Sequence, residues 1–357
     1  MNTMDTLTSD AIDLLKRLIQ TPSFSQEEEE TAGIIERFLQ ERGVQTRRIA
    51  NNVWVQNKHF TGDLPTLLLN SHLDTVQPNE GWTRDPFQPT LDNDTLYGLG
   101  CNDAGGPLVS LIATFLHYYE DESLPFNLVL AATAEEEISG ENGILRILDE
   151  IDPVHLAMVG EPSGMALTIA ERGHLVLEVS EQGQSGHAAR DAGENAIYRA
   201  IQDIRWFQSY EFPEQSDLLG NVKMTVTMID GGVQPNVIPD SCRFVVDVRV
   251  PDVYTNHQVF SEIQQQITGS VRRLSRDLKS SRLPDGHPLL AAAEEIGLRL
   301  TASPTSSDQG LLSIPSVKIG PGQSERSHTA DEYIRLSEIE EGIRLFIRLL
   351  ARLERIT

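Results

Sequence analysis

The chain has 357 residues, of which 39% are hydrophobic, and 29 basic against 53 acidic residues give it a formal net charge of -24. This length favours two domains, and the negative charge repels phosphate backbones and anionic lipids, so we expect neither nucleic acid nor membrane partners. The polar N-terminal sequence lacks a signal-peptide pattern, and no apolar run approaches the roughly 18 residues of a membrane span, so we expect a cytoplasmic protein.

The outer parts of the chain alternate helical patterns with short apolar runs. Apolar residues spaced by three and four predict two amphipathic helices within residues 10–42, separated by a break at Thr21, Pro22 and Ser23. The apolar runs occupy residues 66–69, 126–132, 156–159 and 316–319. Such alternation is typical of an α/β domain whose central sheet is mainly parallel.

The middle of the chain has a different pattern. Strand patterns cover residues 175–179, 222–229 and 242–250, and helical patterns cover residues 195–207 and 257–274. Their order predicts an α+β unit of the split-βαβ, ferredoxin-like type. After residue 281 the strand and helix alternation resumes, and it ends in an amphipathic helix at 337–353. We therefore predict an α/β domain of residues 1–166 and 283–357, interrupted by an inserted domain of residues 167–282.

Histidine and acidic residues gather just after the apolar runs of the predicted α/β domain. In open parallel sheets such residues meet beyond the carboxyl ends of the strands. The candidates are His72, Asp74, Asp103, Glu135, Glu136, Glu137, Glu161 and His328. Converging carboxylates repel one another unless cations hold them, and mixed histidine and carboxylate ligands suit zinc and its neighbours. Residues 135–137 can equally form an exposed helix start, and the acidic run 27–30 is typical of solvated surface.

Three further features limit the alternatives. The glycine-rich stretch YGLGCNDAGG is similar to a phosphate loop, but the negative charge of Asp103 opposes pyrophosphate binding, which disfavours a dinucleotide-dependent enzyme. Cys101 and Cys242 form no CxxC pair, so we expect two ordinary buried thiols. A non-catalytic binding protein is disfavoured because potential ligands and a potential base are all present.

Seven short motifs, in order, carry a family resemblance: SHLDTV, YGLGCNDAGG, TAEEEISG, VGEPS, SGHAA, NVIPDSC and SHTADEY. With them the chain resembles, over nearly its whole length, the metallopeptidase family of acetylornithine deacetylase, succinyl-diaminopimelate desuccinylase, aminoacylase and carboxypeptidase G. Within this family, the chain length and the motifs are most similar to those of short acetylornithine deacetylase-like enzymes. The resemblance implies a zinc-peptidase-like catalytic domain, an inserted lid or dimerisation domain, and a homodimer.

The resemblance also implies a two-zinc centre. Asp103 would bridge the two ions, with His72 and Glu161 completing one and Glu137 and His328 completing the other. Cobalt or manganese can replace zinc in such mixed sites. The family often has lysine after the bridging aspartate, and Ala104 stands there in this chain, which changes the charge near the metals.

The remaining roles follow from the same resemblance. Asp74 would support His72 from behind, and Glu136 would be the general base, although three consecutive glutamates leave a one-residue shift open. His187 would reach the reaction oxyanion. Arg172, Asn236 and Arg249 would contact the substrate, and an arginine fork suits an α-carboxylate. Arg249 can instead make a structural ion pair within its strand.

The implied reaction is hydrolysis of the amide bond of a small N-acyl amino acid. A zinc-bridged hydroxide would attack the carbonyl, with its proton taken up by the base. We expect N-acetyl- or N-succinyl-ornithine or citrulline as substrate, in arginine biosynthesis. A succinyl group would need a further cation, for which Arg282 and Arg326 are candidates. A dipeptidase or broad aminoacylase is the nearest alternative, and a non-catalytic metal-binding relative is a more distant one.

Overall fold

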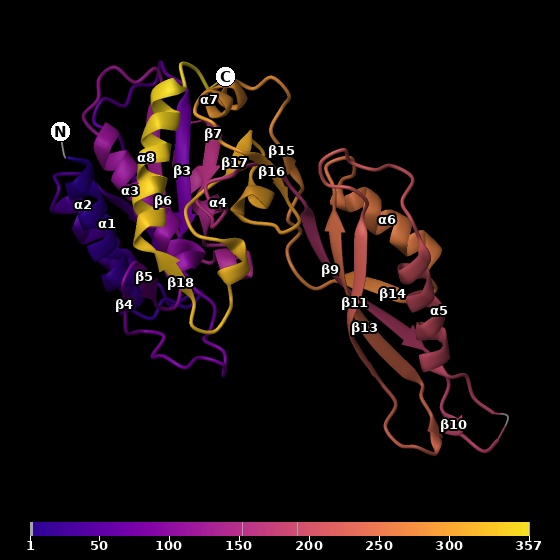
Figure 1. The fold of residues 1–357 in the computed structure, drawn as a ribbon. Helices are drawn as coiled ribbons and strands as arrows, with labels where there is room; N and C mark the ends of the chain where they lie inside the picture. The colour runs from indigo at the N-terminus through magenta and orange to yellow at the C-terminus, as the bar shows by residue number, and fades with distance from the viewer. Residues whose placement is uncertain (1–2, 152, 191, 357) are drawn as a thin grey trace. The chain divides into compact units, whose positions relative to one another are not determined.

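The computed structural model describes residues 3–151, 153–190 and 192–356. These residues divide into two compact units (Figure 1). Unit 1 comprises the described residues up to Ile169, Arg282–Thr301 and those from Leu311 onward, and unit 2 comprises Ala170–Ser281 and Ala302–Gly310. The domain boundaries at residues 166 and 283 stay a prediction. Among the described residues, no helix combines the length and the apolar character needed to cross a membrane.

The large sheet is mixed, with a parallel centre. Its strand order is β1 (Arg47–Ile49), β2 (Asn52–Gln56), β6 (Asn127–Thr133), β3 (Thr66–His72), β7 (Val154–Val159), β17 (Ser316–Lys318), β8 (Leu167–Glu171) and β15 (Ser281–Arg282), and β16 (Leu300–Ser303) also pairs with β8. The neighbours β6, β3, β7 and β17 run parallel, whereas β2 joins β6 antiparallel. The four apolar runs predicted as strands thus form the parallel centre, as expected.

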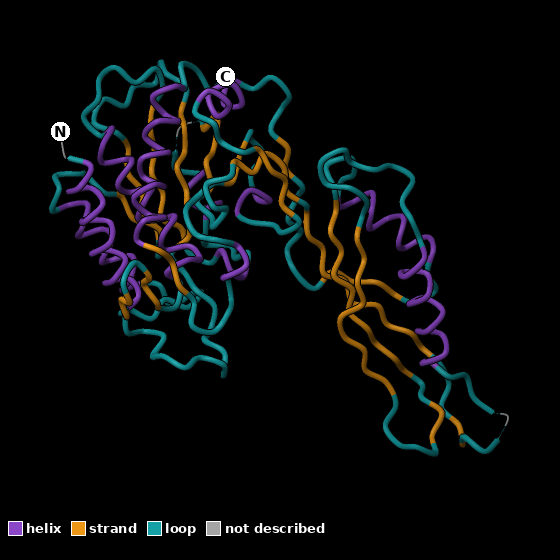
Figure 2. The backbone as a smooth tube through the Cα atoms, viewed as in Figure 1, coloured by secondary structure: helices purple, strands orange, loops and turns teal. Residues whose placement is uncertain are grey.

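Alternate residues of the central strands face two hydrophobic cores. Leu67 and Leu69 of β3 lie in the larger core, and Leu68 lies in the smaller one. Helices α1 (Met4–Ile19), α2 (Glu29–Gln40), α3 (Gly106–Tyr118) and α8 (Leu336–Arg352) contribute to the larger core, and α4 (Ile144–Leu148) to the smaller one. Figure 2 shows helices on both faces of this sheet. Burial on both faces explains why these strands read as continuous apolar runs.

Shorter elements complete the fold. They are α7 (Pro288–Glu295), a small sheet of β18 (Tyr333–Arg335), β5 (Thr95–Tyr97) and β4 (Thr90–Asp92), and the pair β10 (Gly186–His187) and β12 (Val237–Ile238). Both cysteines are free and buried, as predicted.

Unit 2 contains an antiparallel sheet with helices on one face. The strand order is β11 (Lys223–Gly231), β13 (Ser241–Val250), β9 (Gly173–Gln182) and β14 (Ser270–Arg273), and α5 (Ala196–Ser209) and α6 (Asn256–Gln266) pack against it. The chain order of strand, helix, strand, strand, helix and strand confirms the predicted split-βαβ arrangement.

The predicted helix 257–274 was wrong at its C-terminal end. Helix α6 ends at Gln266, and Ser270–Arg273 is strand β14. The Asp203 carboxylate accepts hydrogen bonds from the N–H groups of Thr268 and Gly269, which turns the chain out of the helix. Val271 then pairs with Val179 of β9. The apolar residue at position 271 continued the helical spacing, so the sequence pattern concealed the strand.

Candidate metal centre

The parallel strands of unit 1 present the candidate ligands at one edge of the sheet. Strand β3 ends at His72, and its two parallel neighbours β6 and β7 end at Thr133 and Val159. Glu135, Glu136 and Glu137 follow β6, and Glu161 follows β7. Since parallel strands end at the same edge, these side chains converge.

Asp103 lies between the two histidines. His72 Nε2 is 3.2 Å from Asp103 Oδ1 and 3.8 Å from Glu161 Oε1. His328 Nε2 is 3.7 Å from Asp103 Oδ2 and 3.1 Å from Glu137 Oε2. The two oxygens of one carboxylate therefore face two different histidines, and each histidine lies near a further glutamate.

The electrostatics of this cluster suit cations. Burial, together with the charge of Asp103, raises the pKa of Glu161 to about 8. A hydrogen bond with Glu137 raises the pKa of His328 to about 9. Glu161 Oε1 is buried without a hydrogen-bond partner among the described residues. A divalent cation would give that oxygen a partner, would stabilise the carboxylates and would keep the histidines neutral, so the donor set fits a metal.

Two overlapping groups have the spacing of metal ligands. Ligand atoms of His72, Asp103 and Glu137 lie within 4.8 Å of one another, and so do those of His72, Glu136 and Glu161. The predicted ligand set is thus brought together in unit 1, with His328 in contact with two of its members.

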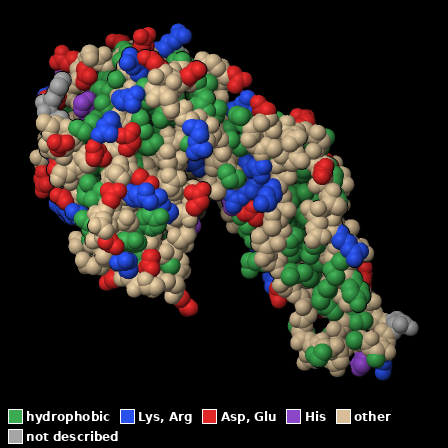
Figure 3. Space-filling model, viewed as in Figure 1, with side chains coloured by type: hydrophobic (Ala, Val, Ile, Leu, Met, Phe, Trp, Pro, Cys, Tyr) green, Lys and Arg blue, Asp and Glu red, His purple; other side chains and the backbone are tan. Residues whose placement is uncertain are grey.

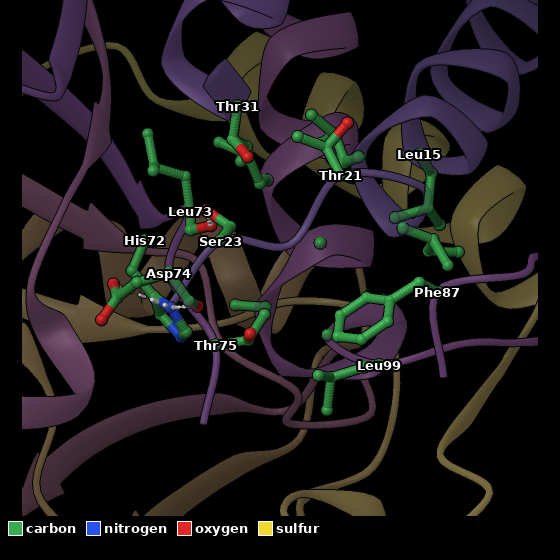
Figure 4. A pocket seen from close by; sticks show the side chains of 16 residues that line it. Leu15, Thr21, Ser23, Thr31, His72, Leu73, Asp74, Thr75, Phe87 and Leu99 are labelled. Carbon is green, nitrogen blue, oxygen red and sulfur yellow. Dashed lines mark hydrogen bonds and ion pairs between the residues drawn. The ribbon is translucent and has the colours of Figure 1, made fainter. Parts of the chain in front are cut away.

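Asp74 lies directly behind His72, as the close-up in Figure 4 shows. His72 Nδ1 donates to the backbone carbonyl of Asp74 at 2.9 Å, which leaves Nε2 facing Asp103. The Asp74 carboxylate accepts from the N–H groups of Glu136 at 3.0 Å and Glu137 at 3.1 Å, and from the Ser25 hydroxyl at 2.7 Å. One aspartate therefore orients the candidate ligand His72 and the loop of the candidate base together.

The three consecutive glutamates point to different partners. The Glu135 carboxylate accepts from the backbone N–H and the side-chain amide of Asn142, at 3.1 and 2.9 Å. Glu136 lies with the ligand group of His72, and Glu137 contacts His328. Glu135 is thus bonded to Asn142, whereas Glu136 and Glu137 both lie within metal-ligand spacing of His72.

A small cavity lies beside His72 and Asp74 (Figure 4). Its volume is about 30 Å³, which is room for water but too small for an amino acid. The hydroxyl oxygens of Thr31 and Thr75 on its wall have no hydrogen-bond partner within the described chain. We therefore expect ordered water in this cavity.

Four candidate residues lie in unit 2. His187 is exposed on β10, and Asn236 is exposed just before β12, where its carbonyl accepts from the Ala188 N–H at 3.0 Å. The structure thus brings His187 and Asn236 to the antiparallel strand pair β10 and β12, in which His187 is opposite Val237.

The two candidate arginines, Arg172 and Arg249, interact electrostatically with each other. Arg249 makes two hydrogen bonds to Asp247, from Nε at 2.7 Å and from a terminal nitrogen at 2.9 Å, so the structural ion pair is present. Arg172 donates to the carbonyl of Leu219. Burial and the charge of Arg249 lower the pKa of Arg172.

Sequence reasoning missed Glu332. Its buried carboxylate accepts from the N–H groups of Gly100 at 2.9 Å, Asn102 at 2.8 Å and Asp103 at 2.9 Å. It therefore holds the loop that presents Asp103. Its place as the last acidic residue of SHTADEY, shortly after His328, was the available signal.

The solvated-surface interpretation of residues 27–30 was wrong for Glu28, which is fully buried. Its carboxylate accepts hydrogen bonds from the N–H groups of Gln26 and Glu135 and from the Asn51 amide, and these donors offset the cost of burial.

Comparisons with known proteins show what the chain is similar to. The sequence profile of Peptidase family M20/M25/M40 matches residues 68–352. A succinyl-diaminopimelate desuccinylase of Cereibacter sphaeroides is 24% identical, over 96% of this chain and 98% of that protein. An acetylornithine deacetylase of Edwardsiella ictaluri is 29% identical, over 93% of this chain and 94% of that protein. The solved structure of the YXEP protein of Bacillus subtilis, a dinuclear metal-binding peptidase, matches with a TM-score of 0.70 at 17% identity. The match covers 99% of this chain and 100% of that chain, so the two share a fold.

Proposed function

Because the chain belongs to peptidase family M20/M25/M40, we propose that it is a two-metal hydrolase that cleaves the amide bond of an N-acyl amino acid. The membership confirms the resemblance seen in the sequence motifs. One observation carries the proposal: the two oxygens of Asp103 face His72 and His328 separately, which is the arrangement of a carboxylate that bridges two ions. We propose zinc at both positions, with cobalt or manganese as alternatives.

The chain's own residues divide the work between them. His72 and Glu161 would hold one ion, Glu137 and His328 the other, and Asp103 both. When bound, the two ions lower the pKa of water and polarise the amide carbonyl. Glu136 would accept the proton of the attacking water and pass it to the departing amine.

Residues of unit 2 would recognise the rest of the substrate. Arg172 and Arg249 would bind the α-carboxylate, and the Arg249 guanidinium is already oriented by its paired bonds to Asp247. His187 would donate to the developing oxyanion, and its exposure on β10 suits a group that meets a ligand. Asn236 would add a further substrate contact beside it.

The amino-acid product would be ornithine or citrulline, with an acetyl or succinyl group as the acid product. One relative is a desuccinylase and another a deacetylase of an amino acid, which supports this substrate class. Of the two arginines considered for a succinyl carboxylate, Arg326 pairs with Glu338 at 2.7 and 3.0 Å, and Arg282 pairs with Asp285 at 3.3 Å. Both therefore have acidic partners, as Arg249 does, and the substrate panel decides between the acetyl and the succinyl group.

The second candidate function is cleavage of dipeptides, or broad aminoacylase activity. It is favoured by the shared fold with a dinuclear peptidase. Both candidates use the same metal centre and differ only in the group that precedes the amide bond.

We also propose a homodimer through the open edge of the unit 2 sheet. Strand β11 lies at that edge, and Met228 and Ile229 on it are 66% and 56% exposed. Tyr198 of α5 is 67% exposed. Figure 3 shows hydrophobic side chains along the visible face of unit 2. An apolar edge strand is a ready surface for pairing with a second copy.

A substrate panel tests the proposed function. Release of free amino acid would be measured for N-acetyl- and N-succinyl-ornithine, N-acetylcitrulline, other N-acyl amino acids and dipeptides, before and after metal removal and zinc restoration. We expect metal-dependent turnover with N-acetylornithine among the best substrates. Turnover of dipeptides alone would select the second candidate, and no turnover by protein that holds two metals would contradict both.

A further inference from the structure

The loop that carries Glu136 is held by side chains from other parts of unit 1. Four consecutive backbone N–H groups, those of residues 134–137, each donate to a side-chain oxygen. The pairs are Ala134 with Asn52 at 2.9 Å, Glu135 with Glu28 at 3.1 Å, and Glu136 and Glu137 with Asp74 at 3.0 and 3.1 Å. The path of this loop is therefore fixed by acceptors that lie outside it.

Glu135 is the residue of the loop that most needs such an anchor. Its φ of 57° is in the left-handed region, which residues other than glycine adopt rarely and keep only where their surroundings impose it. Glu135 directly precedes Glu136, so its backbone conformation sets the direction in which the Glu136 side chain leaves the chain. The bond from the Glu135 N–H to Glu28 acts at this point.

The burial and the hydrogen bonds of Glu28 suit it to this contact. The residue is fully buried, and one carboxylate oxygen accepts from the N–H groups of Glu135 and of Gln26, the latter at 2.7 Å. The other oxygen accepts from the Asn51 amide at 2.7 Å. Although Glu28 occupies the position before helix α2, its side chain makes no capping bond to that helix. Its charge is directed at the loop instead.

We propose that Glu28 is a positioning residue that fixes the Glu135 backbone and thereby aims the Glu136 carboxylate. Glu28 lies outside residues 68–352, the stretch that matches the family profile. The proposal rests on the proposed function, in which Glu136 is the general base. A base must lie within about 2.6–3.2 Å of the proton that it takes, and a misplacement of about 1 Å can cost about 100-fold in rate. Loss of the bond between Glu28 and the Glu135 N–H should therefore lower kcat strongly and change substrate binding little.

Three variants with the zinc-loaded full chain test this role. Glu28→Ala removes the anchor, and we expect kcat to fall about 10- to 100-fold while KM and the number of bound metals stay unchanged. Glu28→Gln should largely restore kcat, because its amide oxygen can accept from the Glu135 N–H while the Asn51 amide turns to accept from its new NH₂ group. Glu28→Asp keeps the charge but is one methylene too short to reach both partners, so kcat should fall as for alanine.

Asn51→Ala is the matched control. It removes the bond to the other oxygen of the same carboxylate and leaves the Glu135 anchor in place, so kcat should stay near the wild-type value. Isothermal titration of each metal-free variant with zinc gives a readout independent of turnover, and two ions per chain are expected throughout.

The outcomes distinguish the positioning role of Glu28 from the proposed function, in which Glu136 is the general base. Wild-type kcat in both Glu28→Ala and Glu28→Asp, alongside an inactive Glu136→Gln, would overturn the role of Glu28 alone. Equal losses of kcat in Asn51→Ala and Glu28→Ala would also overturn it, since that pattern means general loosening. Full activity of Glu136→Gln would instead contradict the proposed function. Should Glu28→Ala fail to fold, the pair Glu28→Asp and Glu28→Gln carries the same test.

Discussion

The candidate groups of the two units differ in how firmly the chain holds them. In unit 1, His72 and Asp74 are buried, and the loops that carry Asp103 and Glu137 are fixed by the buried carboxylates of Glu332 and Asp74. In unit 2, His187 and Asn236 are exposed at the short strand pair of β10 and β12. Metal ligands must be preorganised to bind an ion, whereas groups that meet a substrate need access to it. The contrast predicts that unit 1 variants change chemistry and metal binding, and that unit 2 variants leave metal binding intact.

The largest effect is expected for Glu136, the proposed general base in unit 1. Glu136→Gln should lower kcat by roughly 10²- to 10⁴-fold, because the amide cannot accept the proton of the attacking water. Steady-state hydrolysis of the best panel substrate measures this, with metal content determined on the same sample. The metal content should stay at the wild-type value. A variant that loses metal along with activity would indicate that Glu136 is a ligand and that the register is shifted by one residue.

His187 should show the next largest effect, and without any change at the metals. His187→Ala should lower kcat by about 10²- to 10³-fold if its ring donates to the oxyanion. Arg190→Ala, a change of an exposed side chain three positions along the chain from His187, is the control and should be nearly silent. Zinc affinity of both variants is measured by titration. Unchanged kcat in His187→Ala would remove this residue from the reaction.

A third prediction tests whether the buried carboxylate of Glu332 holds the Asp103 loop of unit 1 in place. Glu332→Ala leaves the N–H groups of Gly100, Asn102 and Asp103 without their acceptor, so the Asp103 carboxylate, the proposed bridge, loses its support. We expect zinc affinity to fall about 10- to 100-fold, the usual effect of losing a residue that supports a ligand. Competition with a coloured chelator measures this loss. Wild-type affinity in a folded Glu332→Ala variant would show that the Asp103 loop keeps its position unaided.

The smallest effect concerns stability, at Asp247 of unit 2. Burial alone would raise the pKa of Asp247, but hydrogen bonds from His174 and Arg249 lower it below its usual value of 3.8. Because the folded-state pKa is the lower one, the ionised carboxylate stabilises the fold above the unfolded-state pKa, and this contribution is lost as pH falls below about 4. Asp247→Asn should cost about 1 kcal/mol at pH 7 and less at pH 3.5.

Urea unfolding of wild type and Asp247→Asn at the two pH values measures that difference. A cost that grows as pH falls would contradict the assignment of the stabilisation to the ionised carboxylate.

Much of unit 1 could be predicted because its signals are local. An apolar run followed at once by acidic or histidine residues marks a buried parallel strand and its carboxyl end, and this pattern placed His72, Glu161 and the three glutamates 135–137 at one edge of the sheet. The strand β14 was missed because its apolar residue fits a helical spacing, and only the contact with Asp203 shows where the helix stops.

The supporting carboxylates were harder to predict because their partners are remote backbone groups. Glu332 bonds to residues about 230 positions earlier, and Glu28 bonds to the N–H of Glu135, 107 positions later. Neither bond requires a particular side chain at the distant residue, so no sequence pattern records it. Glu28 also lies within an acidic run, where solvent exposure is the ordinary expectation.

The most direct test of the metal centre is the number of ions bound by wild type and by Asp103→Ala. Metal-free protein would be titrated with Co²⁺ while heat and visible absorbance are recorded. A centre bridged by Asp103 predicts two ions per chain in the wild type and weakened binding of both in the variant. Two ions bound by Asp103→Ala with wild-type affinity would contradict the shared carboxylate on which the proposed function depends.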